Sequence, residues 1–230
     1  MWNGKNKAIT FSFDDGVLQD IRLAELFNKY NLKATFNINS ALLGTHNSLK
    51  WGEKTVAHDK VFPSKVKEVY AGHEVAAHTL THAWLPSLAD DAVIYQVERD
   101  RLTLSDLLGY EVVGMAYPGG GENNNDHIAE LVKNHTGIKY ARTIVSTGNF
   151  DLQDNYYRFN PTVYACSKDF ESIVDKFIEL KTDKPQLLYI WGHAYEMDTE
   201  AIPWDRFERI IAKLANLPDV FYGTNKEVLL

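Results

Sequence analysis

A chain of 230 residues with 45% hydrophobic residues is long enough to bury one sizeable core, and we expect a single domain over residues 1–230. The formal net charge of −7, without any run of lysine or arginine, argues against a nucleic-acid-binding surface or a polybasic membrane anchor. Its single cysteine, Cys166, excludes an internal disulfide. The expected partner is therefore a small molecule or a glycan.

The predicted elements alternate between short β-rich runs and amphipathic stretches that follow a helical period. Strands are expected near residues 7–13, 33–39, 73–78, 112–117, 139–145, 159–164, 186–192 and 219–223. Helices fall between most of them. This order predicts an α/β fold with a largely parallel sheet, and the number of strands favours a closed or nearly closed (β/α) barrel.

No apolar run in the sequence approaches membrane-spanning length, so we expect no membrane insertion. No apolar stretch precedes the first predicted strand either. We therefore expect a cytoplasmic protein from the chain as given, or a secreted one if an export signal has been removed. The sequence gives no indication of the oligomeric state.

Polar residues gather where the predicted strands end, which is where the chemistry of a parallel barrel collects. Asp14 and Asp15 follow the first strand, His78 closes the third, residues 117–121 (Tyr-Pro-Gly-Gly-Gly) follow the fourth, and His193 follows the seventh. Each feature alone has a plainer interpretation as a turn, a structural histidine or a tight loop. Together they predict one functional mouth, because unrelated turns have no reason to place such residues at successive strand ends.

The residue types at this mouth are those of a divalent metal site. Adjacent carboxylates such as Asp14 and Asp15 repel each other unless a cation or a proton separates them. His78 and His82, four residues apart, can supply nitrogen ligands. The sequence therefore predicts a metal-dependent hydrolase.

The motifs also carry a family resemblance. Residues 10–16 (Thr-Phe-Ser-Phe-Asp-Asp-Gly), the segment 72–75 (Gly-His-Glu-Val) and the following 78–82 (His-Thr-Leu-Thr-His) resemble the first two motifs of the polysaccharide deacetylases, the NodB-homology domain of carbohydrate esterase family 4. The strand at 34–37 also fits. The resemblance extends from near residue 8 to near residue 195.

This resemblance implies a distorted (β/α) barrel with seven or eight strands and a divalent metal, usually zinc. It also implies hydrolysis of acetyl groups from amino sugars or esterified sugars, so that the partner would be an acetylated oligo- or polysaccharide. Carried over residue by residue, it makes Asp15, His78 and His82 the ligands and Asp14 the general base. Three protein ligands leave an open position for water. Two histidines and a carboxylate would equally suit iron, cobalt or nickel.

Two further motifs of the family have counterparts here. Residues 116–120 (Ala-Tyr-Pro-Gly-Gly) align with the third motif, so Gly119 would offer its backbone N–H to the developing oxyanion. His193 fits the fifth motif and would protonate the leaving amine or alcohol. Tyr117 could stack against a sugar ring or serve only in packing.

The chain also departs from the family pattern. Where the family has an arginine that pairs with the catalytic aspartate, this chain has Ala116, and we expect Arg142 or Arg158 to replace it unless both are ordinary surface or packing residues. The fourth motif survives only as residues 151–156, without its tryptophan. Asp154 is then our candidate for orienting His193. Glu196 could orient His193, contact a sugar hydroxyl or merely be solvated.

The segment from Ala41 to Phe62 is too long for a plain connection, and we expect a loop over the site. Its His46 and His58 are additional ligand candidates.

The leading hypothesis is a zinc-dependent de-N-acetylase of a glycan. Two alternatives remain open: hydrolysis of small amides or cyclic imides, known from the same superfamily, and a glycan-binding domain with little turnover.

Overall fold

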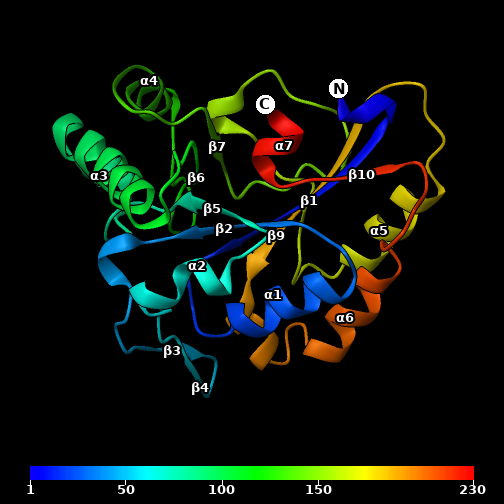
Figure 1. Ribbon diagram of the computed structural model, residues 1–230, viewed down its shortest axis with the longest axis horizontal. Helices are drawn as coiled ribbons and strands as arrows, with labels where there is room; N and C mark the ends of the chain where they lie inside the picture. Colours follow the sequence, from blue (N-terminus) through cyan, green and yellow to red (C-terminus); the bar gives the residue numbers. More distant parts are fainter.

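The computed structural model describes all residues from 1 to 230, and its main feature is a curled parallel sheet (Figure 1). The strands lie in the order β7-β6-β5-β2-β1-β9-β8, and β10 pairs with the first part of β1. The main-sheet strands are β1 (Lys7–Asp14), β2 (Ala34–Ile38), β5 (Glu74–Ala77), β6 (Gly114–Ala116), β7 (Tyr140–Arg142), β8 (Val163–Tyr164), β9 (Gln186–His193) and β10 (Val220–Tyr222). All eight strands expected from the sequence are present.

The sheet curls far enough for its two edges to approach each other. The segment that leads into β8 forms a parallel bridge with β7 through Phe159 and Arg142, and then pairs with β9 through Val163. The expectation of a distorted (β/α) barrel is therefore confirmed.

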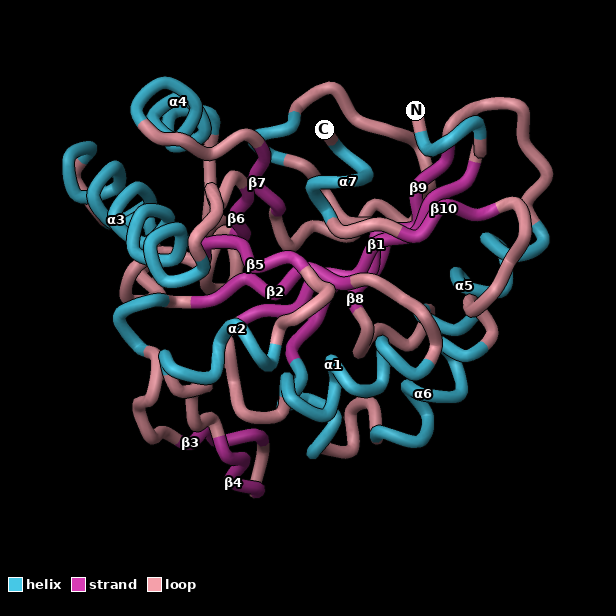
Figure 2. The backbone as a smooth tube through the Cα atoms, viewed as in Figure 1, coloured by secondary structure: helices cyan, strands magenta, loops and turns pink.

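Helices pack around this sheet, as expected from the alternating pattern (Figure 2). They are α1 (Asp20–Lys29), α2 (Val66–Val69), α3 (Asp90–Leu108), α4 (Asp126–His135), α5 (Phe170–Glu179), α6 (Trp204–Ala212) and α7 (Asn225–Leu229). None of them combines the length and the apolar character needed to cross a membrane.

The two faces of β1 differ in character because successive side chains point to opposite sides of a strand. Phe11 and Phe13 pack against Phe27 of α1, and Phe13 also contacts Phe207 of α6. These side chains belong to a core of 46 buried residues that joins the sheet to its helices. Burial of this apolar surface is the main source of stability for the barrel wall.

The other face of β1 lines the interior of the barrel. At its lower end, Ala8 contacts a second apolar cluster that includes Tyr140 of β7, Tyr189 of β9 and Val228 of α7. Because β7 and β9 are not neighbours in the sheet, these residues meet across the interior. Further along β1, the side chains on this face are polar: Thr10 and Ser12 make buried hydrogen bonds, and Asp14 ends the strand.

The segment between β2 and β5 contains a feature that the sequence analysis did not predict. It forms an antiparallel hairpin of β3 (Ser48–Trp51) and β4 (Lys54–Ala57), which lies apart from the main sheet in Figure 1. Most of its side chains are exposed, so its sequence lacks the alternation of apolar residues that marks a strand packed on a core.

Candidate metal and catalytic site

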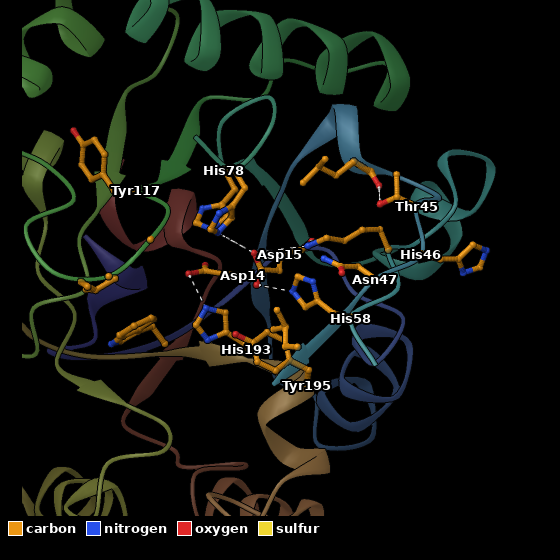
Figure 3. A pocket seen from close by; sticks show the side chains of 18 residues that line it. Asp14, Asp15, Thr45, His46, Asn47, His58, His78, Tyr117, His193 and Tyr195 are labelled. Carbon is orange, nitrogen blue, oxygen red and sulfur yellow. Dashed lines mark hydrogen bonds and ion pairs between the residues drawn. The ribbon is translucent and has the colours of Figure 1, made fainter. Parts of the chain in front are cut away.

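The end of β1 and the turn that follows it place Asp14 and Asp15 at the centre of a cavity of about 610 Å³ (Figure 3). Asp15 adopts a left-handed backbone conformation with φ of 86°, and Gly16 follows with φ of 65°. A side chain on Gly16 would lie 2.9 Å from the Ile38 side chain, so only glycine fits there. The tight turn sends the two neighbouring carboxylates in different directions.

Asp15 lies beside the two histidines that follow β5. Its Oδ1 lies 3.3 Å from His82 Nε2 and 3.8 Å from His78 Nε2, and one ligand atom from each residue lies within 4.8 Å of the others. A tetrahedral ion with bonds of about 2.0–2.1 Å would separate its ligand atoms by roughly 3.4 Å. The spacing therefore fits a divalent ion.

Two details of the surroundings also suit a metal. Asp15 Oδ1 is buried and accepts no hydrogen bond from the protein, so its lone pairs are free to bind a cation. His78 Nδ1 lies 2.8 Å from the carbonyl oxygen of Ala116, and donation there leaves Nε2 free as a ligand. Burial lowers the pKa of His78 to about 4, so its imidazole is neutral at neutral pH, as a ligand must be.

The loop that carries the histidines is itself held in place by buried polar groups. Asp100 of α3 accepts a hydrogen bond from the backbone N–H of His78 at 2.9 Å, and Asn39 donates to the Thr79 carbonyl at 2.8 Å. Thr79 and His82 both have positive φ, at 61° and 58°. Non-glycine residues in such conformations concentrate at functional sites, where the surrounding structure holds them.

Asp14 lies deeper than Asp15 and has a different partner. Nη2 of Arg142 lies 2.5 Å from each of its carboxylate oxygens, and Asn37 donates to Oδ1 at 2.8 Å. Burial alone would raise the pKa of Asp14, but Arg142, through its charge and its hydrogen bond, and the nearby His78 and His193 together outweigh this effect and hold that pKa below its usual value. Asp14 is therefore ionised at neutral pH.

Of the two arginines considered from the sequence, only Arg142 reaches Asp14. It is completely buried, and its Nε also donates to Ser12 at 3.2 Å. Arg158 instead binds Asn124 and Asp126, the latter on the exposed surface of α4. The candidate Arg158 is thus wrong as a partner of Asp14.

His193, at the end of β9, lies beside Asp14, its register partner at the end of the neighbouring strand β1. Its Nε2 lies 4.0 Å from Asp14 Oδ2, and its Nδ1 lies 2.9 Å from Oε1 of Glu196. Burial would lower the pKa of His193, but the charge and hydrogen bond of Glu196, together with the charges of Asp15 and Asp14, outweigh it and raise that pKa to about 9. His193 is therefore protonated at neutral pH.

Glu196, rather than Asp154, is the carboxylate beside His193. It lies in the 3-10 turn Ala194–Asp198, where Oε2 also accepts the backbone N–H of His193 at 3.0 Å and a bond from Cys166 at 3.3 Å. The Tyr164 hydroxyl donates to Oε1. Asp154 is exposed in a separate cleft, so the expectation that it orients His193 is wrong.

The third-motif segment lines the cavity opposite the hairpin. Gly119 borders the cavity, and its N–H donates to no acceptor within the protein, so it is available to a ligand. The Tyr117 ring also lines the cavity, but its hydroxyl turns away and donates to the Tyr157 carbonyl at 2.8 Å (Figure 3). The hydroxyl of Tyr117 is thus already paired within the protein.

The segment from Ala41 to Phe62 forms the remaining wall. Thr45, Asn47 and Leu49 border the cavity together with His58 and Lys60. His58 approaches Asp15, whereas the His46 side chain is 77% exposed and pairs with Asp59. Lys60 was not identified from the sequence, because a lone lysine in a connecting segment carries no signal of a buried site.

Comparisons with known proteins agree with this arrangement. The family model "Polysaccharide deacetylase" matches residues 3–141, which is more than half of the chain. A search of curated proteins found no match.

Several solved structures share the fold. The Xyl-CE4 domain of a multidomain xylanase from the hindgut metagenome of Trinervitermes trinervoides is 15% identical with a TM-score of 0.61, over 97% of this chain and 89% of that one. Streptococcus pyogenes deacetylase PplD in complex with acetate is 20% identical with a TM-score of 0.54, over 65% of this chain and 61% of that one. BC0361, a polysaccharide deacetylase from Bacillus cereus, is 19% identical with a TM-score of 0.52, over 65% of this chain and 44% of that one.

The chain thus spans less than two thirds of PplD and of BC0361. At these identities the likeness concerns the fold, whereas the family match includes Asp14, Asp15, His78 and His82. The chain therefore belongs to the polysaccharide deacetylase family.

Proposed function

We propose that this protein is a metal-dependent hydrolase that removes acetyl groups from N-acetylated or O-acetylated sugars of an oligo- or polysaccharide. The observation that carries the proposal is the arrangement of one cavity: a three-residue ligand cluster on one side, and Asp14 and His193 4.0 Å apart on the other. This separates the groups that would bind a metal from those that would move protons.

Asp15, His78 and His82 would hold the metal, with zinc as the first candidate. When bound there, a divalent metal would supply Lewis acidity that activates water and polarises the acetyl carbonyl. Iron, cobalt and nickel remain possible occupants because two imidazoles and one carboxylate suit them as well.

Asp14 would act as the general base. Because Arg142 keeps it ionised, it can take a proton from the attacking water at neutral pH. Asn37 and Arg142 fix its orientation, so it need not reorganise during the reaction. The Gly119 N–H would stabilise the oxyanion that develops on the acetyl group.

His193 would act as the general acid. Glu196 holds it in the protonated form and fixes Nδ1, so Nε2 carries the proton that the leaving amine or alcohol requires. The two proton-transfer groups thus enter the reaction in opposite charge states, as base and acid catalysis of a single hydrolysis demands.

The direct test measures acetate release from chitooligosaccharides and from acetylated xylan by zinc-supplied protein. Asp14→Asn and His193→Gln should each lower kcat by at least about 10²-fold, since each removes a proton-transfer group. Asp90→Asn and His127→Gln, which alter an exposed pair on α3 and α4, serve as matched controls. Unchanged acetate release in both site variants would refute the mechanism.

Hydrolysis of small amides or cyclic imides is a second candidate. A cavity of about 610 Å³, walled on one side by the segment 41–62, is within the usual size of small-molecule sites. A substrate panel separates the two functions: ammonia or ring-opened product without acetate from any glycan would favour the second.

A further inference from the structure

The strand-like segment from His58 to Val61 is attached along the loop that carries Asp15. Lys60 forms an antiparallel bridge with Val17, and the backbone N–H of Val61 donates to the Gly16 carbonyl at 2.9 Å. Leu18 N–H donates in turn to the Asp59 carbonyl at 2.8 Å. The backbone of the segment thus pairs with the turn after β1. This pairing places the side chains of His58 and Lys60 next to Asp15.

Lys60 binds the backbone of Asp15. Its Nζ donates to the Asp15 carbonyl oxygen at 2.6 Å and lies 3.8 Å from Oδ1, while the side chain is only 4% exposed. Asp15 needs such support because a non-glycine residue is strained at φ of 86°. On its other side, the N–H of Asp15 donates to the Asn37 carbonyl at 2.9 Å. Both backbone polar groups of Asp15 are therefore fixed.

His58 binds the carboxylate of the same residue. Its Nε2 lies 3.1 Å from Asp15 Oδ2, on the side of Asp15 away from His78 in Figure 3. Oδ1 is then left free, and it is this oxygen that faces His78 and His82. The His58 ring packs at right angles to Tyr195, with 5.1 Å between centroids, which fixes the ring itself.

We propose that Lys60 and His58 are positioning residues that hold Asp15 in the conformation from which Oδ1 can bind the metal. The inference rests on the metal site of the proposed function. It gives the segment 41–62 a second role, because the segment would support the metal ligand as well as wall the cavity. Neighbours that orient a metal ligand typically contribute about 10–100-fold to metal affinity.

The test measures zinc affinity of the purified apo protein by competition with a chromogenic chelator. Lys60→Met removes the donor but keeps most of the volume, and His58→Phe removes the ring nitrogens but keeps the contact with Tyr195. Each should weaken zinc binding by at least about tenfold. Lys60→Arg, which keeps a donor and the charge, should recover part of the loss. Lys54→Met is the matched control, since Lys54 is exposed in the same segment 41–62 and binds only Glu200.

Circular dichroism and thermal melting of each apo variant accompany the titration. Zinc affinities of Lys60→Met and His58→Phe within twofold of the unmodified protein would overturn the inference. A variant that does not fold without zinc would also count against it, because its residue would then be needed for the fold rather than for the ligand. The zinc titration contains no substrate, so it does not depend on catalysis. A protein that binds zinc but releases no acetate would therefore refute the proposed function and leave this inference standing.

Discussion

Arg142 reaches from β7 across the barrel interior to Asp14 on β1, where its Nη2 contacts both carboxylate oxygens at 2.5 Å. The strands β7 and β1 are four places apart in the sheet, so the contact joins opposite walls. The third family motif normally supplies an arginine for this purpose, but this chain has Ala116 at that position. The carbonyl of Ala116 instead contacts His78.

Replacing this arginine should affect both stability and activity. Arg142→Met leaves Asp14 buried without its charged partner, which should lower the free energy of unfolding by about 3–5 kcal/mol. The pKa of Asp14 should rise, and acetate release at pH 7 should fall by about 10²-fold because the base becomes protonated. Chemical denaturation and an acetate assay measure the two effects. Arg158→Met, which breaks contacts with Asn124 and Asp126 but none with Asp14, should change neither the stability nor the acetate release by much.

Removing the charge beside His193 should change the pH profile. Glu196→Gln keeps the shape of the side chain but removes the strongest of the causes that raise the His193 pKa to about 9, so that pKa should fall because burial opposes the protonated form. The basic limb of the kcat profile should then move to lower pH by at least about one unit. Rate measurements from pH 5 to 10 show the shift, and an unmoved basic limb would argue against Glu196 as the partner of a general acid.

Zinc should stabilise the folded protein through its three ligands. An ion present at about 100 times its Kd adds about 2.7 kcal/mol to the free energy of unfolding, provided that it binds only the folded state. Thermal melting should therefore show a higher Tm with zinc and a lower one after chelation. His82→Ala should lose this response while keeping its apo Tm, because His82 is 36% exposed and leaves little cavity. His127→Ala on α4 should keep the response.

A buried acid next to the site predicts a pH-dependent stability. Asp20, the first residue of α1, is fully buried, accepts a bond from the Tyr70 hydroxyl at 2.8 Å, and has its pKa raised to about 8 by burial. A raised folded-state pKa gives stability that is complete below about pH 4 and is lost as the pH rises through 8. Asp20→Asn cannot ionise, so it should gain about 2 kcal/mol or more over the unmodified protein between pH 5 and pH 9. Denaturation at both pH values tests this, with exposed Asp91→Asn as the control.

The order of the elements could be predicted from the sequence because buried strands leave short β-rich runs and the helices between them leave amphipathic stretches. The eight strands of the main sheet were found in this way. The hairpin of β3 and β4 was missed because its side chains are mostly exposed, and exposure removes the pattern by which a strand is recognised.

Some residues of the site could likewise be predicted from the sequence, and others could not. The ligand cluster could be anticipated because His78 and His82 lie close together in the sequence and follow a strand. The choice between Arg142 and Arg158 depends on which of them points into the barrel, and sequence spacing alone does not determine this. Asp154 was chosen by its position in a degraded motif, whereas Glu196 lies only three residues after His193 and reaches it through a local 3-10 turn. Lys60 carried no signal at all.

The central position of β1 has a consequence for how this chain is made. Its residues pair with β2 shortly after synthesis, but their other neighbours, β9 and β10, begin only at Gln186 and Val220. Throughout most of translation, the edge of β1 that later pairs with β9 and β10 would therefore lack its partners. Contacts so distant along the chain slow folding and leave the nascent polypeptide open to misassociation, so refolding yield should fall steeply as protein concentration rises.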